Sequence, residues 1–232
     1  VAADLEDALA MVEEGRAHLA AAGVTITQPR LERMRFAPAY KAVTQQLACR
    51  RGGPTPDDPS ELAGLDIAVV AGSSYEETLE RLAARHPGVE WRVEAHASAM
   101  PLLEAVQEGR LECTLADSNL VAFARLRFPE IETPLDLTGE QTLAWALPTQ
   151  AEALDDWLGG WFAEAHADGT LEALDERWYG HLRKFDYVDV ARFIRRLEER
   201  LPPLQPHFIR AAEDAELDWS VLAAQAYQES HW

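Results

Sequence analysis

Strand and helix patterns alternate along the chain up to residue 147, and this order restricts it to α/β architectures. Ile67–Val70 is a continuous apolar run typical of a buried strand, and after Gly72-Ser73-Ser74 a helical pattern covers residues 75–84. The same order recurs where a strand pattern over 113–116 precedes a helical pattern over 119–126. Strands that alternate with helices favour parallel pairing, so we predict a parallel α/β sheet.

The pattern changes near residue 185, after which the sequence carries no strand signal. Helical patterns cover residues 190–199, 206–215 and 219–232, and Pro202-Pro203 interrupts them. An all-α segment that follows an α/β segment indicates a second domain with its own core. We therefore predict a domain boundary at this change.

The charge balance is strongly acidic, because 40 acidic side chains outnumber 21 basic ones and give a formal net charge of −19. Such a chain repels nucleic acid and anionic membrane surfaces, so neither is an expected partner. Cys49 and Cys113 are the only cysteines, and neither lies in a spacing typical of metal or redox sites. We therefore expect no metal and no cofactor, and whether the two cysteines pair stays open.

The two ends of the sequence predict a segment of a longer precursor, truncated at both ends. The first residue, Val1, is not an initiator methionine, and an interior helix pattern follows it at once. The last helical pattern runs to the final residue, Trp232. Neither a signal peptide nor a transmembrane stretch is present in between.

Four short segments stand in a fixed order between residues 4 and 180. They are Thr25-Ile26-Thr27-Gln28-Pro29-Arg30 with Phe36 and Tyr40 after it, Gly72–Leu79, Gly109–Asp117, and Asp168-Gly169-Thr170-Leu171. Together they resemble the polar amino-acid binding proteins, which have the type II periplasmic solute-binding fold. The resemblance implies a bilobal α/β domain over residues 1–183 that is N-terminally incomplete, with lobe one at 1–47 and 140–183 and lobe two at 48–139. Glu112 stands where the family has Asp, which leaves the ligand class open.

Five residues in these segments offer chemistry suited to an amino acid or a muropeptide. Arg30 can hold an α-carboxylate through two parallel hydrogen bonds, and Thr25 adds a hydroxyl. Ser73 and Ser74 stand at a predicted helix N-terminus, where free N–H groups attract an anion. Asp117 follows a strand, where ligands of open sheets bind, and can take an α-ammonium. Structural roles also fit, with Arg30 a surface loop residue, Ser73 a plain N-cap and Asp117 a cap for the next helix.

The last helical pattern places Leu222, Ala226 and Glu229 at helical spacing. A carboxyl at the inner end of an apolar stripe can have a raised pKa and carry a proton near neutral pH, whereas a solvated helix-end glutamate cannot. The run Leu222–Trp232 resembles the catalytic helix of the lytic transglycosylases that share the goose-type lysozyme fold. The resemblance implies that Glu229 is the sole catalytic acid/base and that Ser230 is a hydrogen-bonding residue beside the substrate.

Further matching segments connect the two regions in one order: Gln45-Gln46-Leu47, Leu115-Ala116-Asp117-Ser118 and Phe185-Asp186-Tyr187-Val188-Asp189. With them, the chain resembles the membrane-bound lytic murein transglycosylases, so residues 184–232 are expected to be the N-terminal helices of an all-α, lysozyme-like domain. The resemblance implies cleavage, without water, of the β-1,4 bond between N-acetylmuramic acid and N-acetylglucosamine in peptidoglycan glycan strands, which leaves 1,6-anhydro ends. It also implies a periplasmic protein attached to the outer membrane of a Gram-negative bacterium. A chain that ends at Trp232 is expected to be inactive alone.

A pure binding module is the alternative: a periplasmic solute-binding or sensory protein for an amino acid or peptide, without enzyme activity. It explains residues 4–180 equally well, but it does not explain the terminal segment Tyr227–Trp232. Downstream sequence separates the two hypotheses, because a transglycosylase continues with glycan-groove motifs and a sensor continues with a transmembrane helix.

Overall fold

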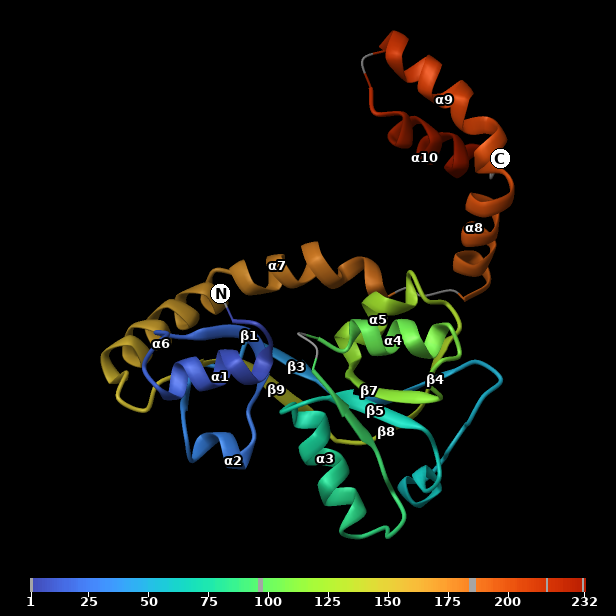
Figure 1. The fold of residues 1–232 in the computed structure, drawn as a ribbon. Helices are drawn as coiled ribbons and strands as arrows, with labels where there is room; N and C mark the ends of the chain where they lie inside the picture. Colours follow the sequence, from blue (N-terminus) through green and yellow to red (C-terminus); the bar gives the residue numbers. More distant parts are fainter. Residues whose placement is uncertain (1, 96–97, 184–186, 216, 231) are drawn as a thin grey trace. The chain divides into compact units, whose positions relative to one another are not determined.

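The computed structural model describes residues 2–95, 98–183, 187–215, 217–230 and 232. Contacts divide the chain into two compact units, Val1–Lys184 and Phe185–Trp232. The first unit contains two β-sheets, and the described part of the second unit is helical (Figure 1). Phe185 and Asp186, from the junction segment quoted above, lie outside the described residues.

The first sheet is built around β9 (Gln141–Leu147), which pairs antiparallel with three other strands. Those strands are β1 (Ala20–Thr25), β2 (Arg35–Phe36) and β3 (Lys41–Val43). Helices α1 (Leu5–Glu13) and α6 (Glu152–Ala167) contribute apolar side chains to the two core clusters beside this sheet, among them Leu9, Val12, Leu158 and Phe162. The helix pattern predicted directly after Val1 is confirmed by α1.

The second sheet has the strand order β6-β5-β7-β4-β8. Its strands are β4 (Gln45–Arg50), β5 (Ile67–Val70), β6 (Arg92–Glu94), β7 (Cys113–Asp117) and β8 (Ile131–Asp136). β5 runs parallel to β6 and β7, as predicted, because helices connect these strands. The prediction is wrong for β4, which runs antiparallel to β7 and β8 and makes the sheet mixed.

The sequence reading missed β8, and its composition explains why. The strand reads Ile-Glu-Thr-Pro-Leu-Asp, so Pro134 and two acidic residues interrupt the apolar alternation. β8 lies at the edge of the second sheet, which is where a sheet tolerates a residue without an N–H group.

Among the remaining helical elements of the first unit, α3 (Ser74–Ala83) and α5 (Ser118–Arg125) lie where the sequence predicts helices over residues 75–84 and 119–126. Helix α3 begins after Ser73, whose hydroxyl accepts from the N–H of Glu76 in an N-cap bond of 3.4 Å. The elements are α2 (Gln28–Leu31), η1 (Pro59–Leu62), α3 (Ser74–Ala83), α4 (Met100–Gln107), α5 (Ser118–Arg125), α7 (Thr170–Tyr179) and η2 (Gly180–Arg183).

The chain passes between the two sheets at two places. Thr44 alone separates β3 of the first sheet from β4 of the second, and residues 137–140 connect β8 to β9. The N–H of Leu137 donates to the carbonyl of Gln45 at 2.8 Å, which bonds one crossing to the other. The N–H of Ser118 donates to the carbonyl of Thr44 at 2.9 Å. Hydrogen bonds therefore connect the Thr44 crossing to the start of the helix that follows β7, and connect residue 137 of the other crossing to the start of β4.

Cys49 and Cys113 form a disulfide across β4 and β7, where they are register partners. Both side chains are fully buried in the core of the second sheet. The sequence left this pairing open because 64 residues separate the two cysteines and only the antiparallel pairing of β4 brings them together.

Replacing both cysteines with alanine is expected to lower the free energy of unfolding by about 3 kcal/mol, because the bridge closes a long loop in the unfolded chain. Chemical denaturation followed by circular dichroism measures the difference. Wild-type protein in a reducing buffer is the control and should unfold with the double variant. A difference below about 1 kcal/mol would contradict the prediction.

The second unit contains α8 (Tyr187–Glu199), α9 (Leu201–Ala215) and α10 (Trp219–Ser230). The predicted start of α9 at Pro206 is wrong, because Pro202 and Pro203 lie in its first turn, where their missing N–H groups have no helical acceptor. Tyr227 packs edge-on against Phe193, with ring centroids 4.8 Å apart. Among the described residues, no helix is long and apolar enough to span a membrane.

Candidate ligand site and catalytic glutamate

Arg30 is a buried cation that joins the two sheets, and 3% of its surface is exposed. Its Nη1 donates to the carbonyl of Thr25 at 3.0 Å, and its Nη2 donates to the carbonyl of Gly72 at 3.1 Å. Its Nε lies 3.5 Å from Oε1 of Glu77 on α3. Burial lowers the pKa of Arg30, and the Glu77 carboxylate opposes that effect. The alternative of a surface loop arginine is therefore wrong.

Side-chain hydrogen bonds that involve two hydroxyl groups also connect elements of the two sheets. Ser74 Oγ donates to Thr25 Oγ1 at 3.1 Å, and Nε2 of Gln45 donates to Ser74 Oγ at 2.9 Å. All three side chains are buried. Thr25 and Ser74 therefore lie in direct contact, and their predicted part in ligand binding stays a prediction.

Ser73 has the structural role that the sequence reading left open. Its hydroxyl donates to the carbonyl of Val70 at 2.6 Å and caps α3. The side chain is buried, and it borders two cavities described below. A part for Ser73 in ligand binding stays a prediction.

Asp117 ends β7 and is 8% exposed. It occupies the N-cap position of α5, yet its side chain makes no capping hydrogen bond. Its Oδ1 is buried and has no hydrogen-bond partner among the described residues. Burial raises the pKa of Asp117 to about 6, although a hydrogen bond with Tyr75 and the charge of Arg30 favour the ionised form. An unpaired buried carboxylate oxygen is costly, so this atom is the strongest indication of a ligand partner.

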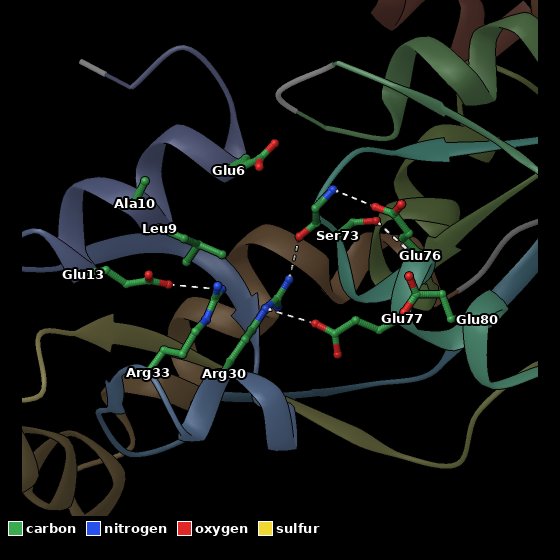
Figure 2. Close-up of a pocket in the computed structure, with 11 residues that line it drawn as sticks. Glu6, Leu9, Ala10, Glu13, Arg30, Arg33, Ser73, Glu76, Glu77 and Glu80 are labelled. Atoms are coloured by element: carbon green, nitrogen blue, oxygen red, sulfur yellow. Dashed lines mark hydrogen bonds and ion pairs between the residues drawn. The ribbon is translucent and has the colours of Figure 1, made fainter.

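Two cavities meet at Ser73. One, of about 400 Å³, is bordered by Asp117, Tyr75 and Asn119 together with residues of α1 and β1. The other, of about 310 Å³, lies between α1 and α3, and Figure 2 shows Arg30 and Arg33 pointing into it. Its acidic lining comes from both helices: Glu6, Glu13, Glu76, Glu77 and Glu80. The predicted carboxylate and ammonium partners therefore border neighbouring cavities.

The sequence reading missed Tyr75, Gln45 and Glu77 as members of this cluster. Tyr75 and Glu77 stand in the quoted Gly72–Leu79 segment, but nothing there signals contact with residues of the first sheet. Burial raises the pKa of Tyr75 far above its usual value, so its hydroxyl stays protonated. Among the described residues, no three His, Cys, Asp or Glu side chains gather in a way that could hold a metal ion.

Glu229 lies in the last turn of α10, and its side chain is exposed. Leu222 and Ala226 are half-buried in the second unit, so the apolar stripe exists but does not shield the carboxylate. Ser230 Oγ donates to the carbonyl of Ala226 at 2.8 Å and accepts from the N–H of Trp232 at 3.1 Å. Of the two alternatives that the spacing left open, the exposed helix-end carboxylate is the one found in this unit. The catalytic roles of Glu229 and Ser230 stay predictions.

Residues 1–181 match the sequence profile of the bacterial extracellular solute-binding proteins, family 3. The chain is 53% identical over all of its 232 residues to a protein of Maricaulis maris named membrane-bound lytic murein transglycosylase F, of which it covers 51%. It is 42% identical to membrane-bound lytic murein transglycosylase F 1 of Alkalilimnicola ehrlichii. That match includes 100% of this chain and 47% of the relative. The chain thus spans about half the length of these relatives.

Solved structures share the fold of the first unit at low sequence identity. A mutant of the arginine-binding protein of T. maritima has a TM-score of 0.69 at 16% identity and covers 78% of this chain and 76% of its own. An ancestral arginine-binding protein bound to arginine has a TM-score of 0.66 at 19% identity. The match covers 76% of this chain and 77% of the ancestral protein. These likenesses confirm the predicted solute-binding fold.

Proposed function

Because the chain belongs to family 3 of the bacterial extracellular solute-binding proteins, we propose that its first unit binds a small zwitterion, either an amino acid or the peptide of a muropeptide. The observation that carries this proposal is the unpaired, buried Oδ1 of Asp117 at the edge of a cavity. A bound ammonium would satisfy that oxygen and would favour the ionised carboxylate.

The opposite end of the ligand would lie toward Arg30. A guanidinium offers five N–H donors, and the contacts of Arg30 with Thr25, Gly72 and Glu77 use three of them. An α-carboxylate would receive parallel hydrogen bonds from this group, with the hydroxyls of Thr25 and Ser74 and the start of α3 at Ser73 nearby.

For the whole natural protein we propose a peptidoglycan lytic transglycosylase, supported by the full-length similarity to proteins of that name. Glu229, as an acid, would protonate the oxygen of the bond between N-acetylmuramic acid and N-acetylglucosamine, so that this bond breaks. The resulting carboxylate, as a base, would then take the proton of the muramyl C6 hydroxyl as that oxygen bonds to C1. The products are a 1,6-anhydro end and a free sugar end, and Glu229 regains its proton.

The proposal places the protein in the periplasm, in contact with glycan strands and attached to the outer membrane. A family of extracellular solute-binding proteins and relatives named membrane-bound murein enzymes support it. The second candidate is a binding or sensory module without activity, favoured by the exposure of Glu229. Digestion of purified peptidoglycan by the natural full-length protein separates the two, because mass spectrometry detects 1,6-anhydro ends only for the transglycosylase.

Isothermal titration of the natural full-length protein with the common L-amino acids tests the binding site. Arg30→Met is expected to weaken the affinity for whichever amino acids bind by about 100-fold, because a ligand carboxylate loses its charged partner. Arg33→Met is the matched control: Arg33 borders the same cavity but is exposed and pairs with Glu13 at 3.0 Å. Equal affinity in the folded Arg30 variant and the wild type, or no binding by any amino acid, would contradict the proposed site.

A further inference from the structure

The arginine proposed to hold a ligand carboxylate already has a carboxylate beside it. Oε1 of Glu77 lies 3.5 Å from Nε of Arg30, and the hydroxyl of Thr27 donates to the same oxygen at 3.3 Å. Glu77 lies on α3, which packs on the second sheet, whereas Thr27 and Arg30 follow β1 of the first sheet. Figure 2 shows Glu77 reaching toward Arg30 from the opposite wall of the cavity.

We propose that Glu77 is an internal competitor for the ligand's carboxylate at Arg30, and that it thereby selects which ligands the site accepts. This inference rests on the proposed function of the first unit. One N–H group on each Nη of Arg30 remains for a ligand, so a bound ligand carboxylate would bring a second negative charge close to the Glu77 carboxylate at Nε. The two carboxylates repel each other, and this repulsion is relieved when Glu77 moves away from Arg30.

The burial of the two partners decides which of them moves. The Arg30 side chain is 3% exposed and bonded to two backbone carbonyls, so it cannot turn away without leaving those carbonyls unpaired. The Glu77 side chain is 27% exposed, so its carboxylate can rotate into water and recover hydration. The displaced group is therefore Glu77.

This competition has a consequence for the class of ligand. A ligand with a full α-carboxylate can replace the charge of Glu77 at Arg30, whereas its neutral α-carboxamide cannot. Removing the charge of Glu77 should therefore strengthen the binding of carboxylates and leave the binding of carboxamides nearly unchanged.

The test is isothermal titration of the natural full-length protein with L-arginine, L-glutamine, L-cysteine and the α-carboxamide of each. Glu77→Gln is expected to raise the affinity for a carboxylate that binds by roughly tenfold and for its carboxamide by less than about twofold. Glu80→Gln is the matched control, because Glu80 lies one turn further along α3 and borders the same cavity but is exposed. The affinities of the Glu80→Gln variant for the carboxylates and for the carboxamides should change by less than about twofold.

Each other outcome has a definite meaning. Unchanged or weaker carboxylate binding by Glu77→Gln, or an equal gain in Glu80→Gln, would overturn the competition, and so would an equal gain for the carboxamide. If neither wild type nor variant binds any probe, the proposed function fails as well. Should Glu77→Gln not fold, Glu77→Ala also removes the carboxylate, and the same gain for carboxylates is expected.

Discussion

Glu229→Gln in the natural full-length protein is expected to lower the release of 1,6-anhydro muropeptides from peptidoglycan by a factor of about 10² to 10⁴. One residue is proposed to act first as acid and then as base, so an amide at this position removes both steps. Mass spectrometry of the digested glycan measures the products. Glu213→Gln, an exposed glutamate on α9 of the same unit, is the control and should retain wild-type activity.

Glu229→Gln is a conservative change at an exposed position, so it should not alter the thermal stability of the protein. A variant that still forms anhydro ends at the wild-type rate would remove Glu229 from the mechanism. If the wild type itself forms none, the protein is a binding or sensory module, and Glu229 is a solvated helix-end carboxylate.

Asp117→Asn is expected to have two effects of opposite sign. It should weaken the binding of a ligand ammonium by about 100-fold, because the charged partner is lost. It should also stabilise the ligand-free protein at neutral pH by about 2 kcal/mol, because a buried carboxylate whose pKa is raised to about 6 is costly when ionised. Titration calorimetry and chemical denaturation measure the two quantities.

The pH dependence follows from the direction of the shift. The folded state raises the pKa of Asp117 above the value of 3.8 that an unperturbed Asp has, so its neutral form is favoured by folding. Relative to the Asn variant, the wild type should therefore lose stability as pH rises from about 4 through 6, and the difference should be constant above that range. Asp136→Asn, an exposed carboxylate on β8, should show no such difference. A stability difference between the wild type and Asp117→Asn that does not vary with pH would contradict the raised pKa of Asp117 as its cause.

The sequence patterns predicted the positions of helices and strands better than they predicted the direction in which the strands pair. Continuous apolar runs such as Ile67–Val70 identify a strand whatever its neighbours are, since they reflect burial on both faces. The direction of β4 depends on the crossing at Thr44, and no local pattern carries that information. β8 was missed because Pro134 and its acidic neighbours are typical of loops as well as of edge strands.

The candidate site was predicted in part, for reasons that differ by residue. Arg30 and Asp117 were selected because their segments resemble those of the polar amino-acid binding proteins, and both residue types suit the two charges of a zwitterion. The contact between Arg30 and Glu77 joins α2, which follows a strand of the first sheet, to α3, which follows a strand of the second, so it depends on the tertiary arrangement of the two. The exposure of Glu229 depends on what surrounds its helix, which spacing along the chain does not determine.

Thr44 and residues 137–140 are the two connections between the sheets, so any rotation of one sheet against the other would have its axis near them. A rotation of one sheet against the other at Thr44 moves each residue in proportion to its distance from that point. The N–H of Ser118, the neighbour of Asp117, donates to the carbonyl of Thr44, so the ligand proposed at Asp117 would lie close to this axis. A ligand as small as an amino acid, bound at that position, would then oppose or favour a rotation whose displacement is largest at the outer ends of the two sheets.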